Sequence, residues 1–267
     1  MKLFGMSFDK SAKDKQWGFT GAARPRFVEG SDTGVLVCHG FGGSPANMRC
    51  LTEAAADMGL TVCAPLLRGH AATFGEMEKF GFEDWRQDAD EAFDRLTQSG
   101  CKRIILCGLS MGALLMADLA ERKRDDERVD SLIMISPALK MRGYLNFSNH
   151  VLKRVTPYVL TRESFNGNPD MEMYYGMATK KLHDIELLSK AVRSGVERIS
   201  VPVRIIAAGK DIRVAPKTYR ILRKALPDSE YSVIEGATHG IPYSAGACEL
   251  VKEFKEYVSG RLDIIGQ

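Results

Sequence analysis

Several features that would place this chain in other classes of protein are missing from its 267 residues. No stretch approaches the roughly 18 consecutive apolar residues that a membrane span needs. The formal net charge is only +3 and basic residues are mixed with acidic ones, so we expect no nucleic-acid partner. The dinucleotide fingerprint GxGxxG is not matched, so we expect no cofactor. Internal repeats are also absent.

The six cysteines show neither CxxC spacing nor pairing with histidines at metal-ligand spacing. Cys38, Cys63 and Cys107 fall inside apolar runs, where a small buried thiol is the expected role. We therefore expect reduced thiols and no metal site. Lysines and aspartates interrupt the N-terminal segment before the apolar core of a signal peptide could form, which favours a cytoplasmic protein.

Short apolar runs alternate with amphipathic segments along most of the chain, after a polar N-terminal leader. The expected strands are 26–28, 34–38, 60–64, 104–107, 129–136, 203–208 and 231–234, and the expected helices are 45–58, 82–98, 111–120, 215–226 and 245–258. This alternation, with nearly continuous apolar strands, predicts an α/β fold with a mostly parallel sheet flanked by helices. We expect one domain spanning residues 1–267.

Residues 139–198 interrupt this alternation. The segment is rich in Met, Tyr and Leu and has helical rather than strand-like periodicity, which predicts a helical cap inserted in the domain. Its apolar side chains could line an acyl or aromatic pocket or pack the cap onto the body, and none is assigned to binding. They are Tyr144, Leu145, Phe147, Val151, Leu152, Tyr158, Met171, Met173, Tyr174, Tyr175 and Met177.

The pentapeptide Gly108-Leu109-Ser110-Met111-Gly112 joins an apolar run to an Ala/Leu/Met-rich helical segment. Gly-x-Ser-x-Gly between a strand and a helix is typical of a nucleophile elbow, where a tight turn lifts the serine above the sheet edge. Ser110 is therefore the candidate nucleophile. Taken alone, the pattern also fits a glycine-bounded turn whose serine caps the next helix.

Two further residues favour the catalytic interpretation. Asp211 and His239 each follow an expected strand, as Ser110 does, and the carboxyl ends of parallel strands meet at one edge of the sheet. A serine hydroxyl becomes nucleophilic when an imidazole accepts its proton, and a carboxylate fixes the imidazole tautomer. The order Ser, Asp, His is typical of hydrolases with this architecture.

Other interpretations of the acid and the base stay open. Asp211 could be an ordinary turn residue, and His239 could cap a helix or hold a loop. Asp184 and Glu186 are poorer candidates for the acid because they fall in the expected cap, and Glu235 precedes the histidine too closely.

A hydrolase of this kind also needs donors for the oxyanion. The glycine-rich loop after the strand 34–38 places the backbone N–H of Phe41 near the site, and the N–H of Met111 directly follows the nucleophile. These two groups are the expected donors. His39 and His70 lie in loops at the same edge, where we expect structural hydrogen bonds rather than catalysis.

The segments HGFGGSP, VCAPLLRGH, FEDW, GLSMG, GKDIRVAP and THG resemble the serine-hydrolase branch of the α/β-hydrolase superfamily. The resemblance is closest to bacterial monoacylglycerol lipases and small carboxylesterases, and it covers about residues 34–254. It implies an α/β-hydrolase fold, a triad of Ser110, Asp211 and His239, and main-chain donors at Phe41 and Met111. Ala113 departs from the pattern, because a third glycine commonly follows the elbow.

The expected function is hydrolysis of a small-molecule carboxylic ester, such as a monoacylglycerol or a short- to medium-chain ester, through an acyl-enzyme intermediate. A hydroxycinnamate-type (feruloyl) esterase is the alternative within enzymes. A non-catalytic binding module that kept the fold is the alternative from another class. The sequence gives neither the acyl and alcohol preferences nor the oligomeric state.

Overall fold

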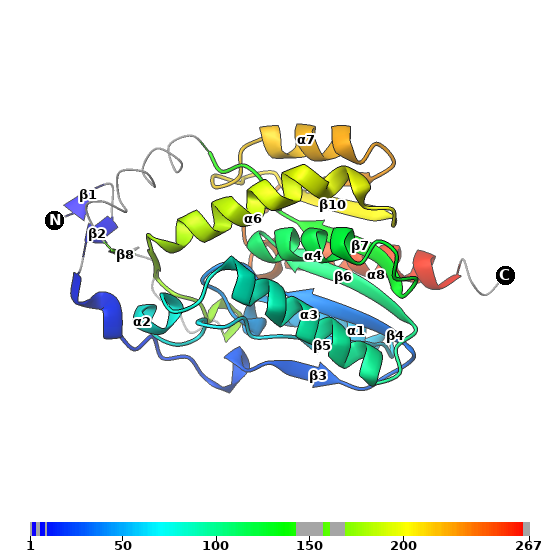
Figure 1. Cartoon of the computed structure of the whole chain (residues 1–267), viewed down its shortest axis with the longest axis horizontal. Coiled ribbons are helices and arrows are strands. Elements are labelled where there is room, and N and C mark those ends of the chain that lie inside the picture. Colours follow the sequence, from blue (N-terminus) through cyan, green and yellow to red (C-terminus); the bar gives the residue numbers. More distant parts are fainter. Residues whose placement is uncertain (1, 4–5, 9, 143–156, 161–168, 264–267) are drawn as a thin grey trace.

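A seven-stranded sheet forms the centre of the computed structural model, which describes all residues except 1, 4–5, 9, 143–156, 161–168 and 264–267 (Figure 1). In spatial order its strands are β11 (Glu230–Ile234), β10 (Val203–Ala208), β7 (Val129–Ile135), β6 (Arg103–Leu109), β4 (Thr33–Cys38), β5 (Thr61–Ala64) and β3 (Arg26–Val28). All neighbours pair in parallel except β3, which runs antiparallel to β5. The predicted α/β fold with a mostly parallel sheet is confirmed.

Helices cover both faces of this sheet, and each face has its own apolar cluster. One face is covered by α3 (Phe82–Gln98), α4 (Met111–Arg122), α6 (Lys181–Gly195) and α7 (Lys217–Ala225), and the other by α1 (Arg49–Asp57) and α8 (Ala247–Asp263). The shorter helices are α2 (Phe74–Met77), η1 (Lys10–Asp14), η2 (Gly21–Ala23), η3 (Pro45–Met48), η4 (Pro169–Met171), η5 (Val196–Arg198) and η6 (Ile241–Tyr243). The segment predicted as one helix over 45–58 is divided into η3 and α1.

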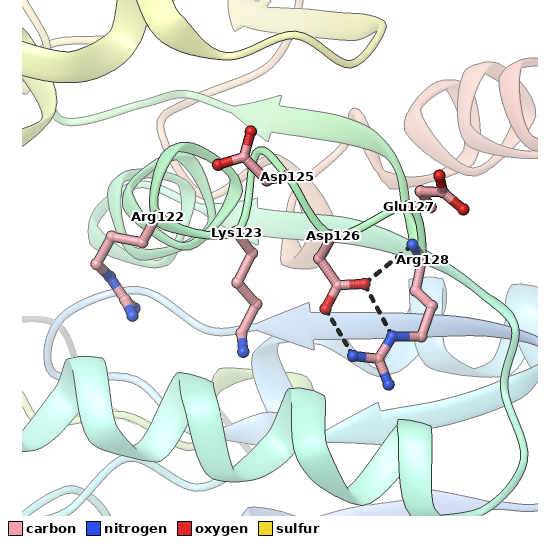
Figure 2. A pocket seen from close by; sticks show the side chains of 6 residues that line it. All are labelled: Arg122, Lys123, Asp125, Asp126, Glu127 and Arg128. Carbon is pink, nitrogen blue, oxygen red and sulfur yellow. Dashed lines mark hydrogen bonds and ion pairs between the residues drawn. The ribbon is translucent and has the colours of Figure 1, made fainter.

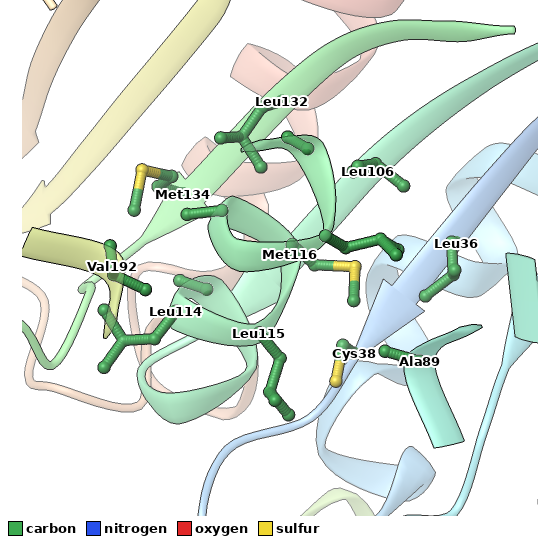
Figure 3. Packing of buried hydrophobic residues seen from close by; sticks show 14 of the residues in the cluster. Leu36, Cys38, Ala89, Leu106, Leu114, Leu115, Met116, Leu132, Met134 and Val192 are labelled. Atoms are coloured by element: carbon green, nitrogen blue, oxygen red, sulfur yellow. The ribbon is translucent and has the colours of Figure 1, made fainter. Parts of the chain in front are cut away.

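Helix α4, which follows the predicted elbow, is the most deeply buried helix of the sheet's first face. Every residue from Met111 to Ala120 is buried, because the sheet packs against one side of α4 while α3 and α6 pack against the other. Figure 3 shows Leu114 beside Val192 of α6, with Leu106 and Leu132 of the sheet in the same cluster. This packing fixes the position of the turn that begins α4.

A second, smaller sheet is built from the N-terminus and from part of the expected cap. Its four antiparallel strands are β1 (Lys2–Leu3), β2 (Met6–Phe8), β8 (Tyr158–Leu160) and β9 (Gly176–Ala178). The prediction of a helical cap is wrong for the residues of β8 and β9, and the sequence analysis assigned no strand to the polar leader. Strands of two or three residues are too short to show alternation, and β8 is completed by pairing with β2 about 150 residues away.

Helical structure does occur in the cap segment, where α6 is 15 residues long and packs against α4. The bounds of the cap at 139 and 198 remain a prediction. Within the described part of the chain, no helix is both long enough and apolar enough to cross a bilayer.

Candidate active site

Ser110 lies at the turn between β6 and α4, in a backbone conformation that few L-residues adopt. Its φ is 56° and its ψ is −110°, a strained combination that neighbouring structure must hold in place. The N–H of Ser110 donates to the carbonyl of Ile135 in β7, and its own carbonyl accepts from Leu114 and Ala138. The turn is therefore fixed by the sheet on one side and by α4 on the other.

The two glycines of the pentapeptide are required by close backbone approaches. A Cβ at Gly108 would lie 2.3 Å from the carbonyl oxygen of Gly112. A Cβ at Gly112 would lie 2.4 Å from the carbonyl oxygen of Cys38 and 2.5 Å from that of His39. Both distances are far inside van der Waals contact. The glycines thus let the turn pack against β4 and against itself, which presents the serine at the sheet edge.

His239 joins the serine to a carboxylate through one hydrogen bond at each ring nitrogen. Its Nε2 lies 2.9 Å from Oγ of Ser110, and its Nδ1 lies 2.8 Å from Oδ2 of Asp211. The acid and the histidine are both buried, whereas Ser110 is half-buried. The structure thus brings together three residues that the sequence placed after separate strands.

The second oxygen of the Asp211 carboxylate is held by backbone donors. Oδ1 accepts hydrogen bonds from the N–H groups of Arg213 at 2.7 Å and Val214 at 2.9 Å. Burial alone would raise the pKa of this carboxyl, but the hydrogen bond and charge of His239, together with the two backbone donors, hold the pKa of Asp211 below its usual value. The acid therefore stays ionised and oriented toward Nδ1, so that Nε2 can accept the proton of Ser110.

The loop after β4 lies directly beside the nucleophile. A Cβ at Gly40 would contact Cβ of Ser110 at 3.4 Å, so Phe41 follows a residue that touches the serine. Met111 is the first residue of α4, where a backbone N–H has no partner within its own helix. These positions agree with the sequence-based choice of Phe41 and Met111 as oxyanion donors, which remains a prediction.

His39 and His70 have the structural contacts that the sequence analysis expected. Nδ1 of His39 bonds the carbonyl of Gly40, and its Nε2 accepts from the N–H of Leu67. His70 packs edge-on against Phe41, with ring centroids 5.9 Å apart. Burial lowers the pKa of His39 to about 4 and, with the nearby His39, that of His70 to about 3. Both rings are therefore neutral supports of the loop that carries Phe41.

The competing carboxylates lie in other environments. Asp184 forms an ion pair with Lys181 at 3.1 Å and accepts from the N–H of Phe82. Glu186 and Glu235 are exposed. Asp211 is the carboxylate whose oxygen is bonded to His239.

The sequence analysis missed a contact between the start of the expected cap and the loop that carries the acid. Arg142 donates from its backbone N–H to the carbonyl of Arg213, and its Nη2 donates to the carbonyl of Asp211 at 2.8 Å. Met141 forms an isolated antiparallel bridge with Val214. No local pattern marks this pairing, because its partners are about 70 residues apart. Arg142 therefore helps to fix the backbone of the acid.

Part of the apolar set expected in the cap can be placed. Tyr144, Leu145, Phe147, Val151 and Leu152 lie outside the described residues. Tyr158 and Tyr174 are buried in a small cluster with Phe74. The backbone N–H of Tyr174 donates to the carbonyl of Gly42, and its hydroxyl donates to that of Gly69. The segment is therefore docked on the loops that follow β4 and β5.

Within the residues that the structure describes, no group of three or more His, Cys, Asp or Glu side chains is arranged to hold a metal ion. Serine, histidine and aspartate chemistry needs no such ion.

Comparison with known proteins shows the class of protein: the chain has the α/β-hydrolase fold and is a hydrolytic enzyme. Residues 30–243 match the family described as serine aminopeptidase, S33, and the chain belongs to this family. The suspected relationship to serine hydrolases of the monoacylglycerol lipase and carboxylesterase group is confirmed.

Two bacterial relatives cover most of the chain. It is 30% identical over 224 residues to a thermostable monoacylglycerol lipase of Bacillus sp. (strain H-257), spanning 82% of this chain and 87% of the relative. It is 24% identical over 207 residues to a carboxylesterase of Bacillus subtilis (strain 168), spanning 74% and 80%. Among solved structures, one reported for the metagenome-derived lipolytic enzymes LipS and LipT superposes with a TM-score of 0.82 at 24% identity, covering 91% of this chain and 99% of that one.

Proposed function

We propose that this protein hydrolyses carboxylic esters through a serine acyl-enzyme, with Ser110 as nucleophile, His239 as general base and Asp211 as the orienting acid. The observation that carries the proposal is the continuous chain of hydrogen bonds from the carboxylate through the imidazole to Oγ of the serine. Each contact lies within the distance that proton transfer requires. The fold and the named relatives support the same reaction class.

In the first step, Oγ of Ser110 attacks the ester carbonyl carbon while its proton passes to Nε2 of His239. The new carbon–oxygen bond forces a pair of electrons onto the carbonyl oxygen. The backbone N–H groups of Phe41 and Met111 stabilise this negative charge. Collapse of the intermediate expels the alcohol, which takes the proton from His239, and leaves the acyl group on Ser110.

The second step mirrors the first. Water attacks the acyl carbonyl while His239 accepts one of its protons, and the same two N–H groups hold the oxyanion. The carbon–oxygen bond to the enzyme then breaks, the carboxylic acid departs, and Ser110 regains its proton. The ionised carboxylate of Asp211 stabilises the imidazolium in both steps.

The substrate class proposed first is a monoacylglycerol or a short- to medium-chain acyl ester. The relative that is 30% identical is a monoacylglycerol lipase, and this is the support for that choice. A hydroxycinnamate ester is the second candidate, since an esterase with bound ferulic acid from Butyrivibrio proteoclasticus is among the structures with this fold, with a TM-score of 0.67. At 17% identity that likeness bears on the fold alone.

The organisation of the chain is part of the same proposal. We place the cap at residues 139–198 of a single domain spanning 1–267. The docking of Tyr174 on the loop beside the nucleophile supports a cap that limits access to Ser110. All six cysteines are free, which is consistent with the proposed cytoplasmic location.

A substrate panel tests the proposal directly. Initial rates would be measured with monoacylglycerols of increasing chain length, p-nitrophenyl esters, methyl ferulate and an aminoacyl p-nitroanilide, the last because the family is described as an aminopeptidase. We expect the highest kcat/KM for acyl esters and loss of all ester turnover in Ser110→Ala. A preference for methyl ferulate would favour the second candidate, and turnover of the anilide alone would contradict the esterase assignment.

A further inference from the structure

The loop that carries Asp211 and the helix that follows it contain an unusual concentration of positive charge. Between Gly209 and Pro227 the chain has six basic residues and one acidic residue, the buried Asp211. All six basic side chains are exposed. They are Lys210, Arg213, Lys217, Arg220, Arg223 and Lys224.

None of these six side chains forms an ion pair with a carboxylate of the described residues, although Arg223 lies over the ring of Tyr231. The charged turn after α4 differs, because its basic side chains are paired with carboxylates. At the turn after α4, Figure 2 shows Arg128 bonded to the carboxylate of Asp126, and Arg122 pairs with Asp90 and Asp118. The segment from Lys210 to Lys224 thus combines six exposed cations, none of which is in an ion pair with a described carboxylate.

This arrangement works against the stability of the helix. Lys217 is the first residue of α7 and no acidic residue occupies the first turn, where the helix dipole favours negative charge. Lys217 and Arg220 are spaced i,i+3, and Arg220 and Lys224 are spaced i,i+4, so like charges lie side by side on one surface. An external anionic partner would relieve this repulsion.

The positive surface extends beyond α7 to the start of the cap. Burial lowers the pKa of Lys140, and the positive charges of Arg193 and Lys217 lower it further against the opposing influence of Glu186. Lys140 is therefore close enough to Arg193 of α6 and to Lys217 of α7 for both charges to act on it. The two helices share one face of the central sheet (Figure 1).

An exposed apolar side chain lies in the same loop as two of these basic residues. Ile212 has 69% of its surface exposed, and with Leu187 of α6, at 36%, it makes up the large hydrophobic residues that are exposed within the described part of the chain. Ile212 lies between Asp211 and Arg213, and Lys210 is two positions before it. An apolar side chain among unpaired cations suits a lipid surface, which has anionic headgroups outside and apolar acyl chains beneath them.

We propose that the face formed by Lys210, Ile212, Arg213, Lys217, Arg220 and Lys224, which we call the cationic face, docks on an anionic lipid surface. The cations would neutralise lipid headgroups while Ile212 enters the interface. A single-stranded nucleic acid fits this surface less well, because the face presents no aromatic platform for stacking bases. The docking goes beyond ester hydrolysis and would place the acid loop next to the lipid.

Vesicle binding tests the proposal without depending on catalysis. The Ser110→Ala variant would be sedimented with vesicles of phosphatidylcholine alone and with vesicles that also contain phosphatidylglycerol. We expect binding to the anionic vesicles that weakens as salt is raised, and binding to neutral vesicles that is at least about tenfold weaker. Absence of binding to anionic vesicles at low salt would overturn the proposal.

Two charge-matched triple variants locate the binding surface. Lys217→Gln, Arg220→Gln and Lys224→Gln together should weaken binding to anionic vesicles about 100-fold, since each basic residue near such a surface contributes about fivefold. The control triple, Lys79→Gln, Lys102→Gln and Lys252→Gln, removes the same charge from exposed positions elsewhere and should bind as before. Equal loss in both triples would show that only net charge matters and would contradict a specific face.

Two further measurements separate this proposal from its rivals. Ile212→Ser should reduce the binding that survives at high salt, where headgroup attraction is screened. A single-stranded RNA that binds the chain at lower concentration than anionic vesicles of equal charge would overturn the lipid assignment. Hydrolysis of a soluble short-chain ester by both triple variants should remain at the level of the unmodified protein, so a failure of docking and a failure of the proposed esterase function can be told apart.

Discussion

Nε2 of His239 lies 2.9 Å from Oγ of Ser110, although 129 residues separate the two in the sequence. The serine follows β6 and the histidine follows β11, which is three strands away in the same sheet. Because every pairing from β6 to β11 is parallel, the carboxyl ends of these strands face the same edge. The contact therefore depends on the topology of the sheet as much as on the two loops.

The acid should be needed for turnover but not for binding. Asp211→Asn keeps the shape of the side chain but removes its charge, and an amide can hold His239 in the wrong tautomer. We expect kcat for a p-nitrophenyl ester to fall by about 10⁴-fold, with a far smaller change in KM. Steady-state kinetics would measure both values.

Glu235→Gln is the matched control for this substitution, since Glu235 is an exposed carboxylate four residues before the histidine. It should leave kcat within about twofold of the unmodified enzyme, as expected for an exposed side chain away from the reacting atoms. A large loss of kcat in Glu235→Gln with none in Asp211→Asn would reverse the assignment of the acid.

The elbow glycine next to β4 should be intolerant of a single methyl group. Gly112→Ala would place Cβ 2.4 Å from the carbonyl oxygen of Cys38, and both backbones are held by the sheet and α4. We expect the free energy of unfolding to fall by about 1–3 kcal/mol or more, measured by urea denaturation. Gly236→Ala, where a Cβ would meet nothing within 4 Å, should change it by less than about 0.5 kcal/mol, and an equal effect of both would contradict the packing argument.

The neutral histidines beside the oxyanion loop should make the protein less stable in mild acid. The pKa of His70 is lowered from 6.5 to about 3 by burial first and by His39 second, so the unfolded chain takes up a proton there below about pH 6.5 while the folded chain does not. Stability is then lost as the pH falls, by about 1.4 kcal/mol between pH 7.5 and 5.5 for this group.

His70→Asn removes the titrating ring and keeps a side-chain donor near the carbonyl of Arg68 that the ring contacts. Urea denaturation at the two pH values should show that the difference in free energy of unfolding shrinks by about 1.4 kcal/mol in the variant. An unchanged pH dependence would mean that His70 is protonated in the folded protein.

Arg142 should act on catalysis through the acid loop. Its Nη2 holds the carbonyl of Asp211, so Arg142→Ala should lower kcat by between about 10- and 100-fold through misplacement of the carboxylate, with little effect on KM. Arg142→Lys, which can still donate to this carbonyl, should recover most of the lost rate. A change in KM alone, or no recovery with lysine, would show that the residue acts on the substrate or on folding instead.

The sequence was sufficient for the parts of the fold that have local signals. The strands before Ser110 and Asp211 are buried apolar runs that end in glycine-containing turns, and such runs identify parallel strands without tertiary information. The position of Ser110, Asp211 and His239 directly after their strands also predicts that they lie close together, because the carboxyl ends of parallel strands are at the same edge of the sheet. Helix 82–98 was predicted with its observed bounds, since its apolar residues recur at helical intervals.

The parts that escaped prediction depend on contacts between distant segments. Strand β8 exists because β2 pairs with it, and a three-residue strand has no periodicity of its own. Arg142 supports Asp211 through a backbone carbonyl, a contact that leaves no trace in residue type or spacing. The unpaired charge of α7 was visible in the sequence, but only the structure shows that no described carboxylate neutralises it.

The central claim is that Ser110 is the nucleophile, and covalent labelling tests it most directly. The folded protein would be treated with a fluorophosphonate, digested, and mapped by mass spectrometry, with loss of esterase activity followed in parallel. We expect a single adduct on Ser110 that forms at the rate at which activity is lost, and no adduct in a folded Ser110→Ala variant. Complete inactivation with the label on another residue, or full activity in Ser110→Ala, would contradict it.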